Sequence, residues 1–224
     1  MSAEDFEILR RHMLAEISAG VVQLRDIIGK AALDDRVMTA LGNVPRHDFV
    51  PIELQPYAYA NIPLPIGFDK TISQPFIVAL MTDLLDISTE DAVLEIGTGL
   101  GYQAAILAQL AHKVYSMELI EELGQEAKRR LRRQGCDNVE LRIANGCHGW
   151  SAHAPFDKII VTAAPDLIPA ALIHQLKAGG KMVIPAGLPE AQQLILLEKG
   201  GDGKVTTKEI LPVRFSQLED SEPG

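Results

Sequence analysis

The sequence predicts an α/β fold with a doubly wound, mostly parallel seven-stranded sheet, antiparallel at one edge, and with a helical extension at the N-terminus. From residue 91 onward, apolar segments alternate with helical segments and carry no polar alternation, which is typical of parallel strands covered on both faces. Only the glycine-rich turn Lys199-Gly-Gly-Asp-Gly203 separates the last two apolar segments, which predicts an antiparallel hairpin. The strands are expected at residues 91–96, 113–118, 139–143, 157–162, 181–185, 193–198 and 205–214.

The helices follow from apolar side chains at helical spacing. Residues 4–19 place Phe6, Leu9, Met13 and Ile17 on one stripe, and Gly20 is expected to end this helix. A second helix over 34–41 has Asp34 as its N-cap, and a third over 76–85 has Pro75 in its first turn. Further helices are expected at residues 102–110, 120–134 and 168–177.

The segment between the second and third helices contains five prolines at residues 45–65, which predicts irregular structure. Its apolar side chains need burial, so we expect it to be packed; they are Phe49, Val50, Tyr57, Tyr59 and Ile62. Residues 67–75 are expected to form a loop. The chain therefore divides into an N-terminal segment (1–75), a sheet domain (76–218) and a disordered tail (219–224), which together form one compact unit.

Composition limits the function classes. The chain has 224 residues, of which 47% are hydrophobic, and a net charge of −9, which disfavours nucleic acid as a partner. No segment has the length and composition of a signal peptide or a membrane span, so a cytoplasmic protein without membrane contact is expected. Cys136 and Cys147 are expected to be free thiols, and the six scattered histidines complete no metal site.

The stretch Val93-Leu-Glu95-Ile-Gly97-Thr-Gly99-Leu-Gly101-Tyr-Gln103 runs from a strand through three glycines into a helix. Glycines at such a turn let the backbone approach a nucleotide closely. Tyr102 stands where a dinucleotide site prefers Gly or Ala, and a second acid, Glu118, ends the next strand about 20 residues on, where it can accept hydrogen bonds from ribose hydroxyls. The pattern favours S-adenosyl-L-methionine over a nicotinamide cofactor, with a purely structural turn as the alternative.

Other polar groups fall at the carboxyl ends of strands, where open α/β sheets bind ligands. Asn145-Gly146 follows the third strand, so Asn145 either contacts an adenine edge or simply forms a turn. Glu95 is expected to be buried and to accept hydrogen bonds from the backbone of the glycine turn. Upstream, Thr71 and Ser73 either cap the helix that begins near Pro75 or act on a ligand, and spacing alone favours capping.

With these blocks assembled, the chain resembles the protein-L-isoaspartate (D-aspartate) O-methyltransferases over roughly residues 30 to 215. The resemblance rests on the glycine motif and on four further blocks. One of them, Thr71-Ile-Ser-Gln-Pro75, is specific to this family and shifts the interpretation of Ser73 from capping toward function. The other three are Asn61-Ile-Pro-Leu-Pro-Ile-Gly67, Ala154-Pro-Phe-Asp-Lys-Ile-Ile-Val-Thr-Ala-Ala-Pro165 and Leu176-Lys-Ala-Gly-Gly-Lys-Met-Val-Ile-Pro185.

The resemblance implies a repair enzyme that transfers a methyl group from S-adenosyl-L-methionine to the α-carboxylate of L-isoaspartyl and D-aspartyl residues in damaged proteins. We expect Ser73 to hydrogen-bond this carboxylate and orient it, with Thr71 assisting. The substrate-binding residues implied are Thr71, Ile72, Ser73, Gln74, Val213 and Arg214. The cofactor-binding residues implied are Glu95, Gly97, Thr98, Gly99, Gly101, Tyr102, Gln103, Glu118, Leu119, Asn145 and Gly146.

Three departures from the family pattern keep alternatives open. Asn145 replaces a usual aspartate, Lys70 a usual glutamine, and Ser216-Gln217 the usual Val-Pro. The alternatives are an S-adenosylmethionine-dependent methyltransferase with another acceptor, and a non-catalytic relative that only binds the cofactor. The chain is expected to be a monomer, with a dimer formed through the N-terminal helix as the alternative.

Overall fold

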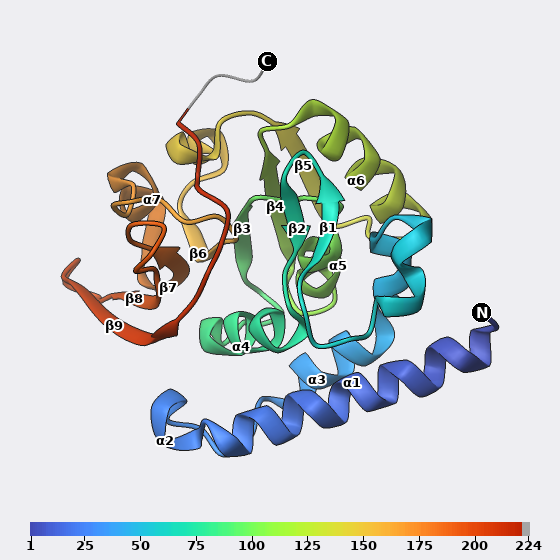
Figure 1. Ribbon diagram of the computed structural model, residues 1–224. Helices are drawn as coiled ribbons and strands as arrows, with labels where there is room; N and C mark the ends of the chain where they lie inside the picture. Colours follow the sequence, from blue (N-terminus) through green and yellow to red (C-terminus); the bar gives the residue numbers. More distant parts are fainter. Residues whose placement is uncertain (221–224) are drawn as a thin grey trace.

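The computed structural model describes residues 1–220 and contains a seven-stranded sheet with strand order β5-β4-β3-β6-β7-β8-β9 (Figure 1). The order reverses direction between β3 and β6, which is where open α/β sheets form their ligand crevices. The parallel strands are β3 (Ala92–Ile96), β4 (Lys113–Glu118), β5 (Val139–Ile143), β6 (Phe156–Val161) and β7 (Leu176–Ala186). The antiparallel edge, β8 (Gln193–Lys199) and β9 (Val205–Pro212), confirms the predicted hairpin.

Helices cover both faces of the sheet, as a doubly wound fold requires. On one face Val93 and Val114 belong to the core that also contains the buried side chains of α4 (Pro75–Leu85), α5 (Tyr102–Ala108) and α6 (Glu121–Arg133). On the other face Leu94 and Ile159 pack in a second core with α7 (Ala170–Gln175). Successive strand side chains enter opposite cores, and this explains why the strand sequences show no polar alternation.

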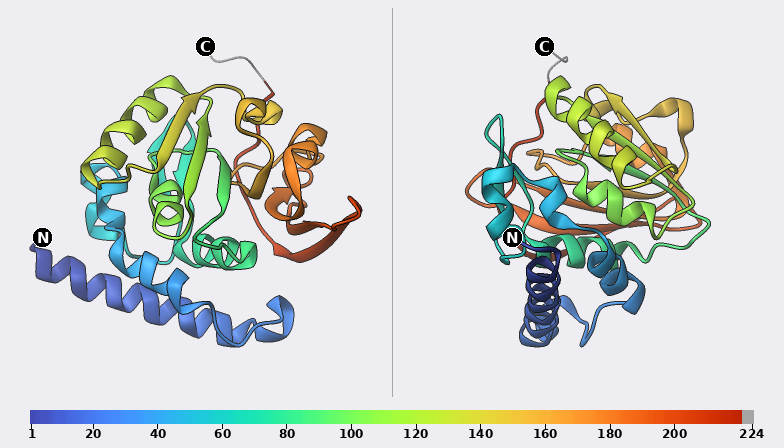
Figure 2. Two further views of the ribbon diagram at one scale, coloured as in Figure 1. Left: turned by 180° about the vertical axis from the view of Figure 1, so that it is seen from behind. Right: turned by 90° about the vertical axis from the view of Figure 1, so that its right-hand side faces the viewer.

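The N-terminal extension consists of α1 (Ala3–Gln23), α2 (Arg25–Ile28) and α3 (Asp35–Asn43), and it lies beneath α4 in both views of Figure 2. The prediction that Gly20 ends the first helix is wrong, because α1 continues to Gln23. A Cβ at Gly20 would lie 3.1 Å from the ring of Phe76, so this glycine serves a close helix contact instead. Asp34 caps α3 as predicted, since its carboxylate accepts from the Arg36 amide at 2.7 Å.

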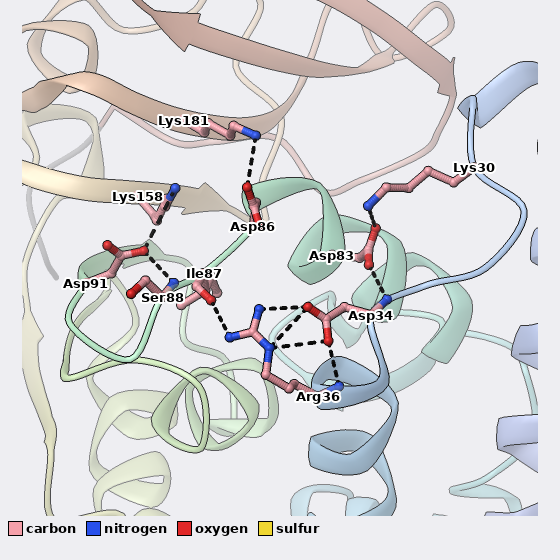
Figure 3. Close-up of polar contacts among 10 residues, drawn as sticks. All are labelled: Lys30, Asp34, Arg36, Asp83, Asp86, Ile87, Ser88, Asp91, Lys158 and Lys181. Atoms are coloured by element: carbon pink, nitrogen blue, oxygen red, sulfur yellow. Dashed lines mark hydrogen bonds and ion pairs between the residues drawn. The ribbon is translucent and has the colours of Figure 1, made fainter.

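Polar contacts fasten this extension to α4 (Figure 3). The Asp83 side chain is fully buried; it accepts a hydrogen bond from the Asp34 amide at 2.7 Å and forms an ion pair with Lys30. Arg36 reaches past α4 and donates to the Ile87 carbonyl at 3.0 Å. These contacts hold the loop after α2 against the helix that precedes β3.

The proline-rich segment is only partly as predicted. It forms two 3-10 helices, η1 (Arg46–Phe49) and η2 (Ile52–Tyr57), and it buries Phe49, Val50 and Tyr59. The expected burial of two other side chains is wrong, because Tyr57 is 59% exposed and Ile62 is 49% exposed.

The predicted loop at 67–75 is also wrong. β1 (Leu64–Gly67) and β2 (Lys70–Ile72) form an antiparallel hairpin with buried Ile66 and Ile72. Its turn places Phe68 and Asp69 at φ 53° and 55°, a conformation that favours Asn or Asp followed by Gly. Phe68 stands at the first position and Asp69 at the second, where Gly is preferred, so the sequence signal for this hairpin is weak.

Two boundaries near the end of the sheet differ from the prediction. α7 is shorter than the predicted helix at 168–177, and β7 begins five residues before the predicted strand. The reason is an irregular pairing, in which Leu176 is opposite Phe156 and Lys181 is opposite Lys158. Two short 3-10 helices, η3 (Gly146–His148) and η4 (Ser151–His153), follow β5. Across residues 1–220, every helix is too short or too polar to cross a bilayer.

Candidate active site

The glycine turn joins β3 to α5 in a conformation that only glycine adopts readily. Gly97, Gly99 and Gly101 have φ values of 95°, 56° and 97°. A Cβ on Gly97 would lie 2.4 Å from Thr162 Oγ1, and the Thr162 hydroxyl donates to the Gly97 carbonyl at 2.7 Å. The turn is therefore locked against the end of β6, and Thr162, which ends the predicted strand at 157–162, is a residue of the site.

Glu118, at the end of β4, organises the backbone on both sides of the crevice. Its carboxylate accepts from the Gly99 amide at 2.7 Å and from the Leu119 and Ile120 amides at 3.0 Å each. Burial raises the pKa of Glu118, and these three N–H groups oppose that shift. A carboxylate has about four lone-pair positions, so acceptor capacity remains toward the crevice.

Glu95 does not have the partners expected for it. Its carboxyl group is fully buried and accepts a hydrogen bond from the Ser116 hydroxyl, which also contacts Thr98. The Gly99 amide of the glycine turn donates to Glu118 instead. Burial raises the pKa of Glu95 to about 8. Glu95 therefore braces the inside of the turn rather than facing a cavity.

A cavity opens above these groups at the carboxyl ends of β3 and β4. Gly97, Gly99, Glu118, Leu119 and Gly146 line it, as the sequence predicted. The chain after β9 closes it: Figure 1 shows this segment returning across the sheet beside β3 and β6, and Gln217 bridges to Ala164 after β6. The further lining residues, beyond the cofactor-binding and substrate-binding residues named above, are Ile66, Lys70, Ile96, Met117, Ile120, Leu123, Thr162, Ala163, Ser216, Leu218 and Glu219.

The closing segment is held by polar contacts at its end. Lys70 forms an ion pair with Glu219 at 2.7 Å, and Asn145 Nδ2 donates to Asp220 at 3.1 Å. The Asn145 side-chain oxygen Oδ1 also accepts from the Cys147 amide at 2.8 Å, so this residue forms the turn expected of Asn-Gly. Of the predicted tail, residues 221–224 lie outside the part of the chain that the structure describes.

A second cavity adjoins the first on the side of the β1–β2 hairpin. Gly97, Gly99, Thr71 and Thr162 line both cavities, so the two meet at the glycine turn. The remaining predicted residues that line the second cavity are Ile72, Ser73, Thr98, Tyr102 and Gln103. Gln103 is fixed there by a hydrogen bond from its side chain to the Thr82 hydroxyl at 2.9 Å.

An outer groove adjoins the second cavity at Ser73. Ser73 and Gln74 line it together with Val213 and Arg214, which follow β9, and Ser73 is the residue that the groove shares with the second cavity. Three cavities thus run from the end of β4 to the surface beside β9. Of the predicted site residues, Glu95, Gly101 and Asn145 line none of the three.

The interpretation of Thr71 or Ser73 as helix caps is wrong. The N-cap of α4 is Gln74, and it makes no side-chain capping bond. Asn61 takes that role instead, since its side chain accepts from the Phe76 amide at 3.0 Å. The Ser73 hydroxyl is therefore not used for the helix, while the Ser73 carbonyl is held by Arg46 at 2.7 Å.

Residues 22–223 match the family described as protein-L-isoaspartate(D-aspartate) O-methyltransferase. The chain belongs to this family. It is similar to protein-L-isoaspartate O-methyltransferase 1 of Polaromonas sp. strain JS666, with 64% identity over 100% of this chain and 95% of the relative. A second protein of that strain, protein-L-isoaspartate O-methyltransferase 2, is 56% identical over 92% of this chain and 98% of its own length.

Solved structures agree. A protein-L-isoaspartate O-methyltransferase superposes with a TM-score of 0.80 and 28% identity, covering 94% of this chain and 66% of that one. A Plasmodium falciparum structure titled as a putative protein-L-isoaspartate O-methyltransferase in complex with S-adenosyl-L-homocysteine has a TM-score of 0.77 at 22% identity, over 95% of this chain and 99% of that one. These findings confirm the predicted fold class, the repair methyltransferase function and S-adenosyl-L-methionine as cofactor.

The residues present fit this cofactor. A buried carboxylate at the end of β4 with spare acceptor capacity suits ribose hydroxyls, and the glycine turn beside it leaves room for close backbone approach. Ile120 and Leu123 add apolar surface to the wall of the same cavity, suited to a flat aromatic ring.

Proposed function

We propose that this methyltransferase acts on the α-carboxylate of L-isoaspartyl and D-aspartyl residues in damaged proteins and that Ser73 orients this carboxylate. The observation that carries the proposal is the position of Ser73. It is shared by the second cavity, which adjoins the glycine turn, and by the groove that opens to the surface, and its hydroxyl caps no helix. A carboxylate that enters along the groove meets this hydroxyl next to the cofactor crevice.

The reaction needs no acid or base catalyst from the protein. A carboxylate with a pKa of about 4 is ionised at neutral pH, so no general base is needed. When bound, S-adenosyl-L-methionine supplies an electrophilic methyl group on its sulfonium. The chain's own task is to align the carboxylate and exclude water, which is a proximity effect. Ser73 donates a hydrogen bond to one carboxylate oxygen and leaves the other free, and Thr71 lies beside it on the hairpin strand.

The remaining roles are assigned by position. The cofactor is held by the glycine turn, by Glu118 and by Gly146, with Glu95 and Gly101 shaping the turn from within. The substrate peptide lies along Gln74, Val213 and Arg214. Residues 1–75 supply the substrate side and 76–218 the cofactor side of one compact unit. We further propose a cytoplasmic monomer that binds neither nucleic acid nor membranes, consistent with the net charge of −9.

The test is transfer of labelled methyl from S-adenosyl-L-methionine to a pair of peptides that differ only in carrying isoaspartate or aspartate. Base-labile label on the isoaspartyl peptide alone is expected, and Ser73→Ala should lower kcat/KM by about tenfold or more, which corresponds to the loss of one hydrogen bond to a charged group. Ser18→Ala, on the exposed face of α1, is the matched control and should leave kcat/KM unchanged. Equal labelling of both peptides would point to a different acceptor. No labelling with intact cofactor binding would point to a non-catalytic relative.

A further inference from the structure

Arg46 is a fully buried arginine in η1, with 0% of its surface exposed. Burying a guanidinium is unfavourable unless its charge and its N–H groups are compensated. Burial lowers the pKa of Arg46, as expected for a cation removed from water. A group this costly needs a reason to be retained.

Its compensation comes from backbone and ring atoms. Nε donates to the Ala58 carbonyl at 2.7 Å, and Nη2 donates to the Ser73 carbonyl at 2.7 Å. The guanidinium carbon lies 4.8 Å from the ring centroid of Tyr102, a cation–π distance. Within residues 1–220, the arginines that pair with a carboxylate are others, namely Arg25, Arg36, Arg129 and Arg130.

The two residues that Arg46 connects, Ser73 and Tyr102, both line the second cavity. Ser73 comes from the substrate side, after β2, and Tyr102 begins α5 directly after the glycine turn. A hydrogen bond to the Ser73 carbonyl restrains the backbone of that residue and hence the direction of its Cα–Cβ bond. The guanidinium fork suits this task because two of its N–H groups reach two carbonyls at a fixed angle, which a lysine ammonium does not do.

We propose that Arg46 is a positioning residue for methyl transfer, which acts through Ser73: it fixes the Ser73 backbone relative to Tyr102 and so aims the Ser73 hydroxyl at the substrate carboxylate. The inference rests on the role proposed above for Ser73. It differs from a general packing role, because it predicts that Arg46 matters for turnover of the isoaspartyl peptide only while the Ser73 hydroxyl is present.

The test is a double-mutant cycle on the full chain, with Arg46→Met and Arg46→Lys each made in the wild-type and Ser73→Ala backgrounds. Calorimetry with S-adenosyl-L-homocysteine counts the folded sites, so kcat and KM for the isoaspartyl peptide are expressed per competent enzyme. We expect Arg46→Met to lower kcat/KM by about tenfold or more in the wild-type background and by less than about threefold in Ser73→Ala. Arg46→Lys should give an intermediate loss of kcat/KM. If Arg46→Met does not fold, Arg46→Lys is compared in the two backgrounds instead.

Arg130→Met is the matched control. Arg130 also donates to backbone carbonyls of the proline-rich segment, those of Asp48 at 2.6 Å and Val50 at 3.1 Å, but it does not contact Ser73. Its effect on kcat/KM should be small and the same in both backgrounds. Equal losses from Arg46→Met in both backgrounds, with Ser73→Ala itself impaired, would overturn the Arg46 inference alone. An unimpaired Ser73→Ala would overturn the role of Ser73 and this inference with it.

Discussion

The Gly99 amide donates a 2.7 Å hydrogen bond to the carboxylate of Glu118, which ties the turn after β3 to the end of β4. Two further amides, those of Leu119 and Ile120, converge on the same carboxylate. One side chain therefore sets the backbone on both sides of the crevice and still faces the cavity. Glu118 therefore helps to set the geometry of the cofactor site.

Replacing Glu118 by Gln should weaken cofactor binding without unfolding the protein. The amide keeps one acceptor oxygen but loses the charge and the second acceptor, so a loss of about 1.5–3 kcal/mol, or about 10- to 100-fold in Kd, is expected. Titration calorimetry with S-adenosyl-L-homocysteine measures the change. Glu121→Gln, three residues on at the start of α6, serves as the control, and equal affinities for the two variants would contradict the assignment.

Gly97→Ala should disrupt the site for a steric reason. The new Cβ would lie 2.4 Å from Thr162 Oγ1, in a backbone conformation with φ 95°. Gly179→Ala is the control for conformational strain alone, because Gly179 has φ 83° and nothing lies within 4 Å of its added Cβ. Both variants should lose about 1 kcal/mol from the left-handed backbone, and Gly97→Ala should lose about 1–3 kcal/mol more, which is the usual cost of overpacking a tight contact. Urea unfolding would reveal the difference, and equal midpoints would refute it.

The stability of the protein should depend on pH through Glu95. Its pKa is raised from 4.5 in the unfolded chain to about 8 in the fold, so the folded state holds a proton that the unfolded state has lost. The contribution of this group is fully present below pH 4.5 and is lost as the pH rises toward 8, with a maximum slope of about 1.4 kcal/mol per pH unit.

Glu95→Gln lacks this titration, so its free energy of unfolding relative to wild type should rise between pH 5 and pH 8, a window set by those two pKa values. A difference in unfolding free energy between the two proteins that stays constant from pH 5 to pH 8 would show that Glu95 is already ionised in the fold. The Ser116 hydroxyl can donate to either side chain, so the two proteins differ in the titration of residue 95 and not in this hydrogen bond.

The N-terminal extension should loosen when the buried carboxylate on α4 is neutralised. Asp83→Asn removes the ion pair with Lys30 and is expected to cost about 1–3 kcal/mol, because the Asp83 side chain is fully buried (Figure 3). Asp86→Asn is the matched control: Asp86 pairs with Lys181 at 3.6 Å, but its side chain is 71% exposed, so the change should stay within about 0.5 kcal/mol. Thermal unfolding measures both changes, and an equal loss of stability in the two variants would contradict the role given to Asp83.

The sequence by itself determined the sheet, its antiparallel edge and the cofactor turn. Each of these is encoded locally: apolar strands without polar alternation, a glycine-rich hairpin, and three glycines between a strand and a helix. Glu118 could be placed at the cavity because a strand-end acid must lie near the switch point once the strands are parallel.

Only the tertiary structure decided which polar groups meet. Glu95 pairs with Ser116 from the neighbouring strand, Asn61 caps α4 in place of Ser73, and Arg46 reaches carbonyls 12 and 27 residues away. The segment after β9 closes the cofactor cavity through contacts with residues far earlier in the chain, such as Lys70. Such partners are chosen by packing between distant segments, and no local spacing in the sequence records them.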